Sequence, residues 1–276
     1  MRPTRPLLPF LGSLALVSAC AAPEAPAPIH GEGENGGAIV LFAEPEGLVF
    51  NAVLYSSASA PFPAIPRGDG KCVLTPASAM GMTNIAVVDL DLGPAVTLSD
   101  GVSPQMAPKE ASAGYADVFG ARHALPGADR LNIQTQGASF DYLSGFAIPA
   151  FGRTWTLTNA GAHDGLQAGT LATITLPAQI TQDPTFESAG SIVPGSPANV
   201  SWSGGDGAAL FHVYAAGAAA SADCYVAAGT TRLELPASVT AQLGPGAYAI
   251  VDAENMQVVH IAGREVLVVS GADNLD

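Results

Sequence analysis

The sequence predicts an all-β protein in which two sandwich-like halves follow a signal peptide and a disordered tether. Short segments rich in β-branched and aromatic residues recur along the chain, and turns rich in Gly, Pro, Asp and Asn separate them. The clearest alternation has Val88, Leu90 and Leu92 on one face of a strand and Asp89 and Asp91 on the other. Hydrophobic residues make up 48% of the chain, more than a disordered protein usually carries, so the body of the chain is expected to fold.

The N-terminal segment has the pattern of a secretory signal. Arg2 and Arg5 precede an apolar stretch at residues 7–17, and small residues follow it. A membrane-spanning helix needs about 20 apolar residues. The stretch is shorter than that and contains a proline and a glycine. Cleavage is therefore favoured over retention as a transmembrane anchor.

The end of this segment, Leu16-Val17-Ser18-Ala19-Cys20, resembles the lipobox of bacterial lipoproteins. The resemblance implies that residues 1–19 are removed and that Cys20, the first mature residue, carries the acyl chains that hold the protein on a membrane. The next residue, Ala21, is not Asp, which by the family's sorting rule implies the outer membrane. Two alternatives stay open: an ordinary secretory signal in which Cys20 is incidental, and a buried helix of the fold.

Residues 20–37 are expected to form a tether. They are rich in Pro, Gly and Glu and contain almost no large apolar side chains, so they cannot bury enough surface to offset the entropy lost on ordering. The prolines stiffen such a segment and the glycines keep it flexible. The folded body is expected to begin at Ala38.

The charge of the chain excludes one class of partner. Lys and Arg total 10 against 24 for Asp and Glu, which gives a net charge of −14. Affinity for nucleic acid rests on Lys and Arg contacts to phosphates. We therefore expect no nucleic-acid binding.

The N-terminal β domain is expected at residues 38–178. Between residues 99 and 126 the pattern is weak and indicates loop with one strand around 115–119. Elsewhere the pattern predicts strands at 38–42, 48–55, 71–75, 84–92, 95–98, 131–135, 140–148, 154–158 and 171–176.

The C-terminal domain is expected at residues 179–276, after a division near residues 178–190. Its turns are closely spaced, which is typical of a sandwich. A short helix is expected at 237–243. Strands are expected at 198–203, 209–214, 223–227, 231–235, 247–251, 256–261 and 265–269.

This C-terminal part resembles immunoglobulin- or fibronectin-like sandwiches of uncharacterised bacterial lipoproteins. The resemblance lies in Val200-Ser201-Trp202 before a Gly/Asp turn, the strand at 211–214, Cys224, and residues 233–239 before a Gly-Pro-Gly turn. It covers roughly residues 190–271 and implies a sandwich fold with no known activity. A second cysteine within the sandwich is missing, so the resemblance implies no internal disulfide. A similar but less clear order of strands occurs in the first half, which gives the hypothesis of an internal duplication. The alternative is that β chains in general share such patterns.

Three cysteines are present, and assigning Cys20 to lipid leaves Cys72 and Cys224. An exported protein keeps disulfides, so these two are candidates to pair. The alternative is two buried free thiols in separate halves of the protein.

The sequence contains little that predicts catalysis or a cofactor. No Gly-x-Ser-x-Gly elbow or Ser-x-x-Lys motif occurs, and the only lysines are Lys71 and Lys109. The histidines have no metal-ligand spacing; His212 and His260 are expected to be half-exposed strand residues, whereas His123 and His163 lie in loops, and His30 lies in the tether. We therefore expect no metal and no cofactor.

Acidic and aromatic residues leave two further hypotheses. The turn residues Asp69, Asp100, Asp206 and Asp252 could serve calcium, but none matches an EF-hand or a glycine-aspartate repeat. Trp202 stands where sandwiches bury an aromatic residue. Trp155 lies in a less regular region, where a ligand-facing role is an alternative to burial.

Together these patterns predict a non-catalytic, lipid-anchored protein of the cell envelope with a structural or binding role. Its partners would be the membrane, through the N-terminal lipid, and an envelope protein or polysaccharide. The rival hypothesis is a carbohydrate-binding or hydrolytic envelope enzyme whose site lies in the loops between Ser99 and Pro126, beside Trp155.

Overall fold

The computed structural model confirms the all-β class. It describes residues 35–44, 47–58, 65–77, 84–88, 92, 95–99, 105–108, 115–117, 131–135, 154–162 and 165–272. Within these ranges the elements are strands except for the helix α1 (Ala237–Leu243) and the short 3-10 helix η2 (Pro184–Phe186). No helix in these ranges is long and apolar enough to cross a membrane.

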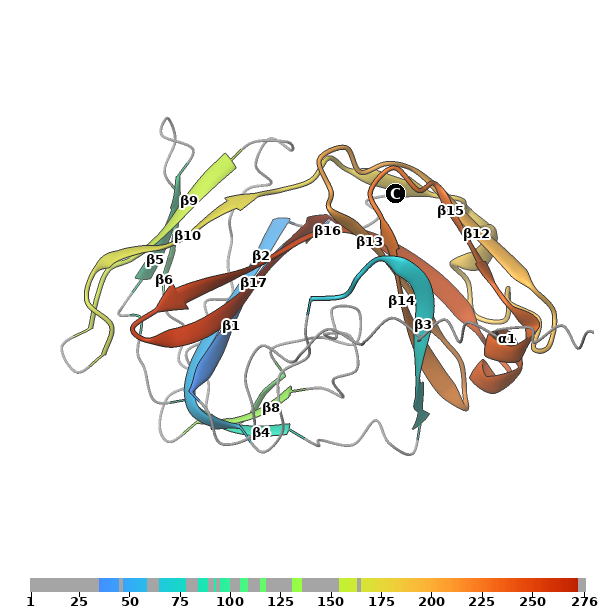
Figure 1. Ribbon diagram of the computed structural model, residues 1–276, viewed down its shortest axis with the longest axis horizontal. Helices are drawn as coiled ribbons and strands as arrows, with labels where there is room; N and C mark the ends of the chain where they lie inside the picture. Colours follow the sequence, from blue (N-terminus) through green and yellow to red (C-terminus); the bar gives the residue numbers. More distant parts are fainter. Residues whose placement is uncertain are drawn as a thin grey trace, which may run out of the picture.

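One long sheet organises the molecule (Figure 1). Its ten strands, in the order in which they lie side by side, are β3 (Asp69–Pro76), β14 (Ala220–Ala227), β13 (Leu210–Ala216), β16 (Tyr248–Ile261), β17 (Arg264–Ala272), β1 (Gly36–Glu44), β2 (Gly47–Ala58), β4 (Asn84–Val88), β8 (Leu131–Thr135) and β7 (Tyr115–Asp117).

Two smaller sheets lie on the outer side of this curved sheet (Figure 1). The four-stranded sheet has the order β10 (Gly169–Thr175), β9 (Thr154–Asn159), β5 (Ala95–Ser99) and β6 (Gln105–Pro108). The three-stranded sheet has the order β11 (Ile180–Gln182), β12 (Ala198–Gly204) and β15 (Arg232–Leu235).

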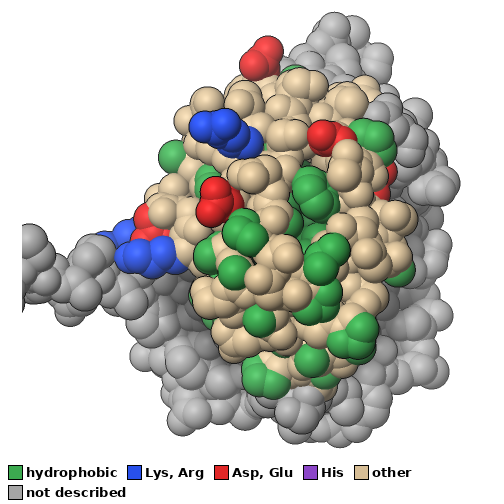
Figure 2. All heavy atoms as spheres, turned by 90° about the vertical axis from the view of Figure 1, so that its right-hand side faces the viewer, with side chains coloured by type: hydrophobic (Ala, Val, Ile, Leu, Met, Phe, Trp, Pro, Cys, Tyr) green, Lys and Arg blue, Asp and Glu red, His purple; other side chains and the backbone are tan. Residues whose placement is uncertain are grey.

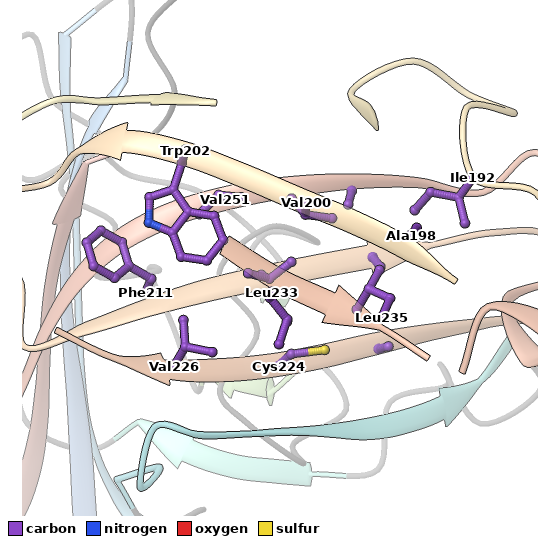
Figure 3. Packing of buried hydrophobic residues seen from close by; sticks show 14 of the residues in the cluster. Ile192, Ala198, Val200, Trp202, Phe211, Cys224, Val226, Leu233, Leu235 and Val251 are labelled. Atoms are coloured by element: carbon purple, nitrogen blue, oxygen red, sulfur yellow. The ribbon is translucent and has the colours of Figure 1, made fainter. Parts of the chain in front are cut away.

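Each smaller sheet covers its own hydrophobic core. The four-stranded sheet packs its apolar side chains on β1, β2 and β17. The three-stranded sheet and α1 pack on β13, β14 and β16, where Trp202 meets Phe211 at a ring-centre distance of 5.4 Å (Figure 3). Trp202 is 5% exposed and so occupies the core position that its sequence context predicts.

The long sheet runs across the division expected near residues 178–190. β1 pairs in parallel with β17, and β3 pairs with β14, so strands from both sides of that division are neighbours. The dividing segment itself contains β11 and η2, which the sequence pattern does not indicate. The two parts of the chain therefore share one sheet, and their independent folding stays a prediction.

The strand β16 differs from what the sequence predicts. Two strands, at 247–251 and 256–261, were expected with a turn between them, but one strand runs from Tyr248 to Ile261. Its first half pairs with β13 and its second half with β17. The polar residues Asp252, Glu254 and Asn255 have the composition of a turn, yet strands on both sides hold their backbone extended.

β13 is central in its part of the long sheet and is buried along its whole length. Phe211 and Val213 belong to the outer core. Because successive side chains of a strand point to opposite faces, His212 between them points to the inner face of the sheet. This face carries the candidate site.

Candidate functional site

The two cysteines that the sequence offers as a pair are joined in the structure. Cys72 on β3 and Cys224 on β14 are directly opposite each other, with a Cα–Cα distance of 4.1 Å and a disulfide between them. The bond links parts of the chain that are 152 residues apart. Cys20 lies outside the residues that the structure describes.

Trp155 requires a correction. Its side chain is 3% exposed and belongs to the core under the four-stranded sheet, next to Leu157 and Ile174. An indole this deeply buried has no surface on which a sugar ring could stack. The ligand-facing role considered for Trp155 is therefore wrong for this structure.

The four Asp residues that the sequence places in turns are not all found there. Asp69 begins β3 and forms a surface ion pair with Lys71 at 3.0 Å, and Asp206 lies in the turn after β12. Asp100 lies outside the described residues, as do Asp89 and Asp91. Asp252 is not in a turn at all but is completely buried in β16.

The two described histidines differ in exposure. His260 is a surface residue with its side chain 72% exposed, 3.7 Å from Glu265. His30, His123 and His163 lie outside the described residues. His212, expected to be half-exposed, is 0% exposed. This correction leads to the candidate site, because a buried imidazole must find polar partners.

Three neighbouring strands bring carboxylates to His212. On β14, Cys224 points into the outer core, so its neighbour Asp223 points to the inner face with His212. On β16, Asp252 is directly opposite His212, and Glu254 is the next residue on the same face. All three acids are at most 4% exposed. The result is a histidine–carboxylate cluster, here His212, Asp223, Asp252 and Glu254, enclosed within the protein.

The imidazole contacts acids through both ring nitrogens. Nε2 of His212 is 3.0 Å from Oδ1 of Asp223, a buried hydrogen bond. Nδ1 is 3.5 Å from Oε1 of Glu254 and 3.8 Å from Oδ2 of Asp252. These last two contacts are electrostatic but too long or too poorly aligned to be hydrogen bonds.

Tyr225 fixes the plane of the ring. It is directly opposite His212 on β14, and the two rings are stacked 4.5 Å apart with their planes only 7° from parallel. Burial raises the pKa of Tyr225 well above its usual value, and the negative charges of Glu254, Asp223 and Asp252 add to this effect.

The acids also determine the charge of the imidazole. Burial disfavours the imidazolium, but the hydrogen bond to Asp223 and the contact with Glu254, together with the charges of both acids, outweigh it and raise the pKa of His212 to about 9. In the metal-free protein His212 therefore has a proton on both ring nitrogens at neutral pH. A single imidazolium neutralises only one of the three carboxylates.

His212, Asp252 and Glu254 together have the ligand atoms for a metal ion. One nitrogen and one oxygen from each acid lie within 4.8 Å of one another. Among the described residues, neither Nδ1 of His212 nor Oε2 of Glu254 has a hydrogen-bond partner. All three residues are buried, so a ligand at this position would have to be small.

Sequence spacing alone does not reveal this cluster. Its members are 11 residues apart between His212 and Asp223, and a further long segment separates them from β16. The usable signal was the spacing Asp-x-Glu at residues 252–254, which places both acids on one face if the segment is a strand. The similarity of that segment to a turn concealed this signal.

The comparisons with other proteins add no relative from which a function could be carried over. No family model, no curated protein and no solved structure matches the chain.

Proposed function

We propose that the protein is a lipid-anchored, non-catalytic protein of the cell envelope, held at the outer membrane through Cys20, with a structural or binding role. The observation that carries the proposal is the disulfide between Cys72 and Cys224. Disulfides persist in exported proteins and are rare in the cytosol. The pairing also leaves Cys20 as the one cysteine of the chain that is available for acylation.

Two further features support a role in display or binding rather than catalysis. The histidine–carboxylate cluster is closed to solvent, and Trp155 is part of the core, so neither supports hydrolysis of an external polymer. Figure 2 shows a face of the molecule with scattered hydrophobic and uncharged side chains and few charged ones. This is in line with the 12% content of charged residues. A surface of this kind is compatible with contacts to another envelope protein or a polysaccharide.

The test of the anchor is mass spectrometry of the mature N-terminus after expression of the full chain in a Gram-negative host. We expect an acylated Cys20 and recovery in the membrane fraction. The variant Cys20→Ser should be released from the membrane, whereas the double variant Cys72→Ser, Cys224→Ser should stay membrane-bound. An unmodified Cys20 in a membrane-free fraction would contradict the proposal.

The test of the role uses the same purified protein. Glycan-array binding and co-purification from envelope extracts are expected to give a partner, and incubation with peptidoglycan and polysaccharides is expected to give no cleavage products. Turnover of either polymer would favour the rival hypothesis of an envelope hydrolase.

A further inference from the structure

The histidine–carboxylate cluster has more negative charge than its own residues can neutralise. Asp223, Asp252 and Glu254 are at most 4% exposed, so water does little to stabilise their charges. Within the cluster, His212 offers at most one positive charge to three carboxylates. Buried charges in proteins are paired or bind metals, so a further cation would relieve this imbalance.

The ligand atoms also lie at the right separation for one ion. Nitrogen and oxygen ligands lie about 2.0–2.2 Å from a zinc-like ion, so two of them can be at most about 4.4 Å apart. Nδ1 of His212 is 3.5 Å from Oε1 of Glu254 and 3.8 Å from Oδ2 of Asp252. Both separations fall within the limit. All three ligand atoms lie within 4.8 Å of one another, so small adjustments of the side chains can place them around one ion.

Asp223 orients the imidazole of His212 for metal binding. A metal ion that binds Nδ1 displaces the proton from that nitrogen into solvent. Nε2 keeps its hydrogen and donates it to Oδ1 of Asp223, so the lone pair of the neutral ring is on Nδ1, the nitrogen that lies beside Asp252 and Glu254. A carboxylate that accepts a hydrogen bond from the remote nitrogen is the usual outer partner of a metal-bound histidine. The stacked ring of Tyr225 holds the imidazole in the same plane.

We propose that His212, Asp252 and Glu254 bind one divalent transition-metal ion of the zinc type, and that Asp223 orients His212 by accepting its Nε2 hydrogen. An imidazole nitrogen selects such ions over calcium and magnesium, which prefer oxygen ligands only. The site is closed to solvent and joins β13 to β16 at their register pair His212–Asp252. The ion is therefore structural: it stabilises the long sheet where β16 passes from one core to the other.

The first experiment measures metal in the wild-type full chain. We expect elemental analysis of the purified protein to find one transition-metal ion per chain, and dialysis against a chelator to remove it. Adding Zn²⁺ back should raise the thermal unfolding midpoint, because an ion that binds only the folded state stabilises that state. Ca²⁺ at the same concentration should leave the midpoint unchanged. A protein that purifies without metal and shows no Zn²⁺-dependent shift would overturn the proposal.

The second experiment uses substitutions that keep the shape of the side chain. Glu254→Gln and Asp252→Asn should each weaken Zn²⁺ binding at least about tenfold, and Asp223→Asn should weaken it by about 10–100-fold through the orientation of His212. The matched control is Glu265→Gln, which removes an acid beside the exposed His260 and should leave the Zn²⁺ shift intact. An equal loss of the shift in the control would assign the effect to the surface pair instead.

A third measurement separates metal binding from a purely structural ion pair. In the chelated protein, Glu254→Gln removes one of three crowded carboxylates and should leave the unfolding midpoint equal to or above that of the wild type. An ion-pair role without metal requires the opposite result, a lower midpoint, because His212 would lose a partner. Should Glu254→Gln fail to fold, the absorption bands of Co²⁺ added to the chelated wild type report nitrogen and oxygen ligation directly. Absence of those bands would count against the site.

Discussion

Cys72 and Cys224 are register partners on neighbouring strands although 152 residues separate them in the chain. β3, which carries Cys72, is the edge strand of the long sheet. An edge strand has only one neighbour to hold it, and here that neighbour is also bonded to it covalently. The disulfide thus secures the end of the sheet that lies beside the histidine–carboxylate cluster.

Removing this disulfide should destabilise the protein substantially. Because it closes a long loop, it restricts the unfolded chain strongly, and the double variant Cys72→Ser, Cys224→Ser should lose about 2–4 kcal/mol of unfolding free energy. Urea unfolding followed by tryptophan fluorescence measures the loss. A reducing agent should shift the wild type towards the double variant and leave the double variant itself unchanged. Equal stability of wild type and variant under oxidising conditions would contradict the prediction.

The local patterns in the sequence predict most strands and the helix α1, because alternation, β-branched residues and turn residues act within a few neighbours. They do not predict which strands become partners. β1 lies beside β17 and β3 beside β14, and these pairings join residues far apart in the chain. Nothing in the alternation of a strand specifies a partner at such a distance, so the shared sheet could not be derived from the pattern alone.

The candidate site could not be predicted from the sequence for a related reason. Residues 252–255 have the composition of a turn, and only pairing with β13 and β17 holds them extended. His212 on its own strand gives no sign of acids on two neighbours. Local preference and tertiary pairing disagree at this segment, and such disagreements concentrate at functional positions.

The side chain of Gln182 makes hydrogen bonds to the backbone of β16 like those of a neighbouring strand. β16 pairs with β17 only from Ala253 onward, which leaves the preceding edge open. The side-chain amide of Gln182 fills this gap: Nε2 donates to the carbonyl of Ala249 at 2.8 Å, and Oε1 accepts from the amide of Val251 at 2.7 Å. The amide thereby ties the three-stranded sheet to β16.

The variant Gln182→Met should therefore lose about 2–4 kcal/mol of unfolding free energy. The apolar side chain fills a similar volume but leaves two buried backbone groups unsatisfied, each costing about 1–3 kcal/mol. Chemical denaturation measures the change. The control is Gln242→Met, because Gln242 is exposed and its amide bonds only within α1, to Ser238. Similar losses in the two variants would show that the buried amide has no special role.

Gly271 is required by the ring of Phe42. The two residues are register partners of β17 and β1, and a Cβ atom at position 271 would overlap the Phe42 ring and approach the carbonyl oxygen of Ala253 at 2.9 Å. Phe42 is fully buried, so its ring has little room to move. Gly271→Ala should destabilise the protein by about 1–3 kcal/mol through overpacking.

Gly169→Ala is the matched control for this prediction. Gly169 also lies in a strand, β10, but a Cβ atom there meets nothing within 4 Å. Its substitution should change the unfolding free energy by no more than about 0.5 kcal/mol. Thermal unfolding of the two variants side by side provides the comparison, and a Gly271→Ala protein as stable as Gly169→Ala would refute the steric argument.

Asp183 should make a pH-dependent contribution at the start of η2. Its Oδ1 accepts hydrogen bonds from the hydroxyl of Thr185 at 2.6 Å and from the amide of Thr185 at 3.0 Å. These bonds, with a weaker one from Ser201, lower the pKa of Asp183 below 3.8. A carboxyl group whose pKa is lower in the folded state stabilises the fold above its unfolded pKa, and this contribution disappears as the pH falls through the folded pKa.

We therefore expect Asp183→Ala to be less stable than the wild type at pH 7, with a difference that shrinks below pH 3.8. Nuclear magnetic resonance titration of the carboxyl carbon measures the pKa directly. Thr185→Val removes the hydroxyl donor, the largest cause of the shift, and should move the pKa of Asp183 back towards 3.8. If Thr185→Val leaves that pKa unchanged, the hydroxyl bond does not stabilise the charged carboxylate, and the lowered pKa must come from the amide of Thr185 and the hydroxyl of Ser201.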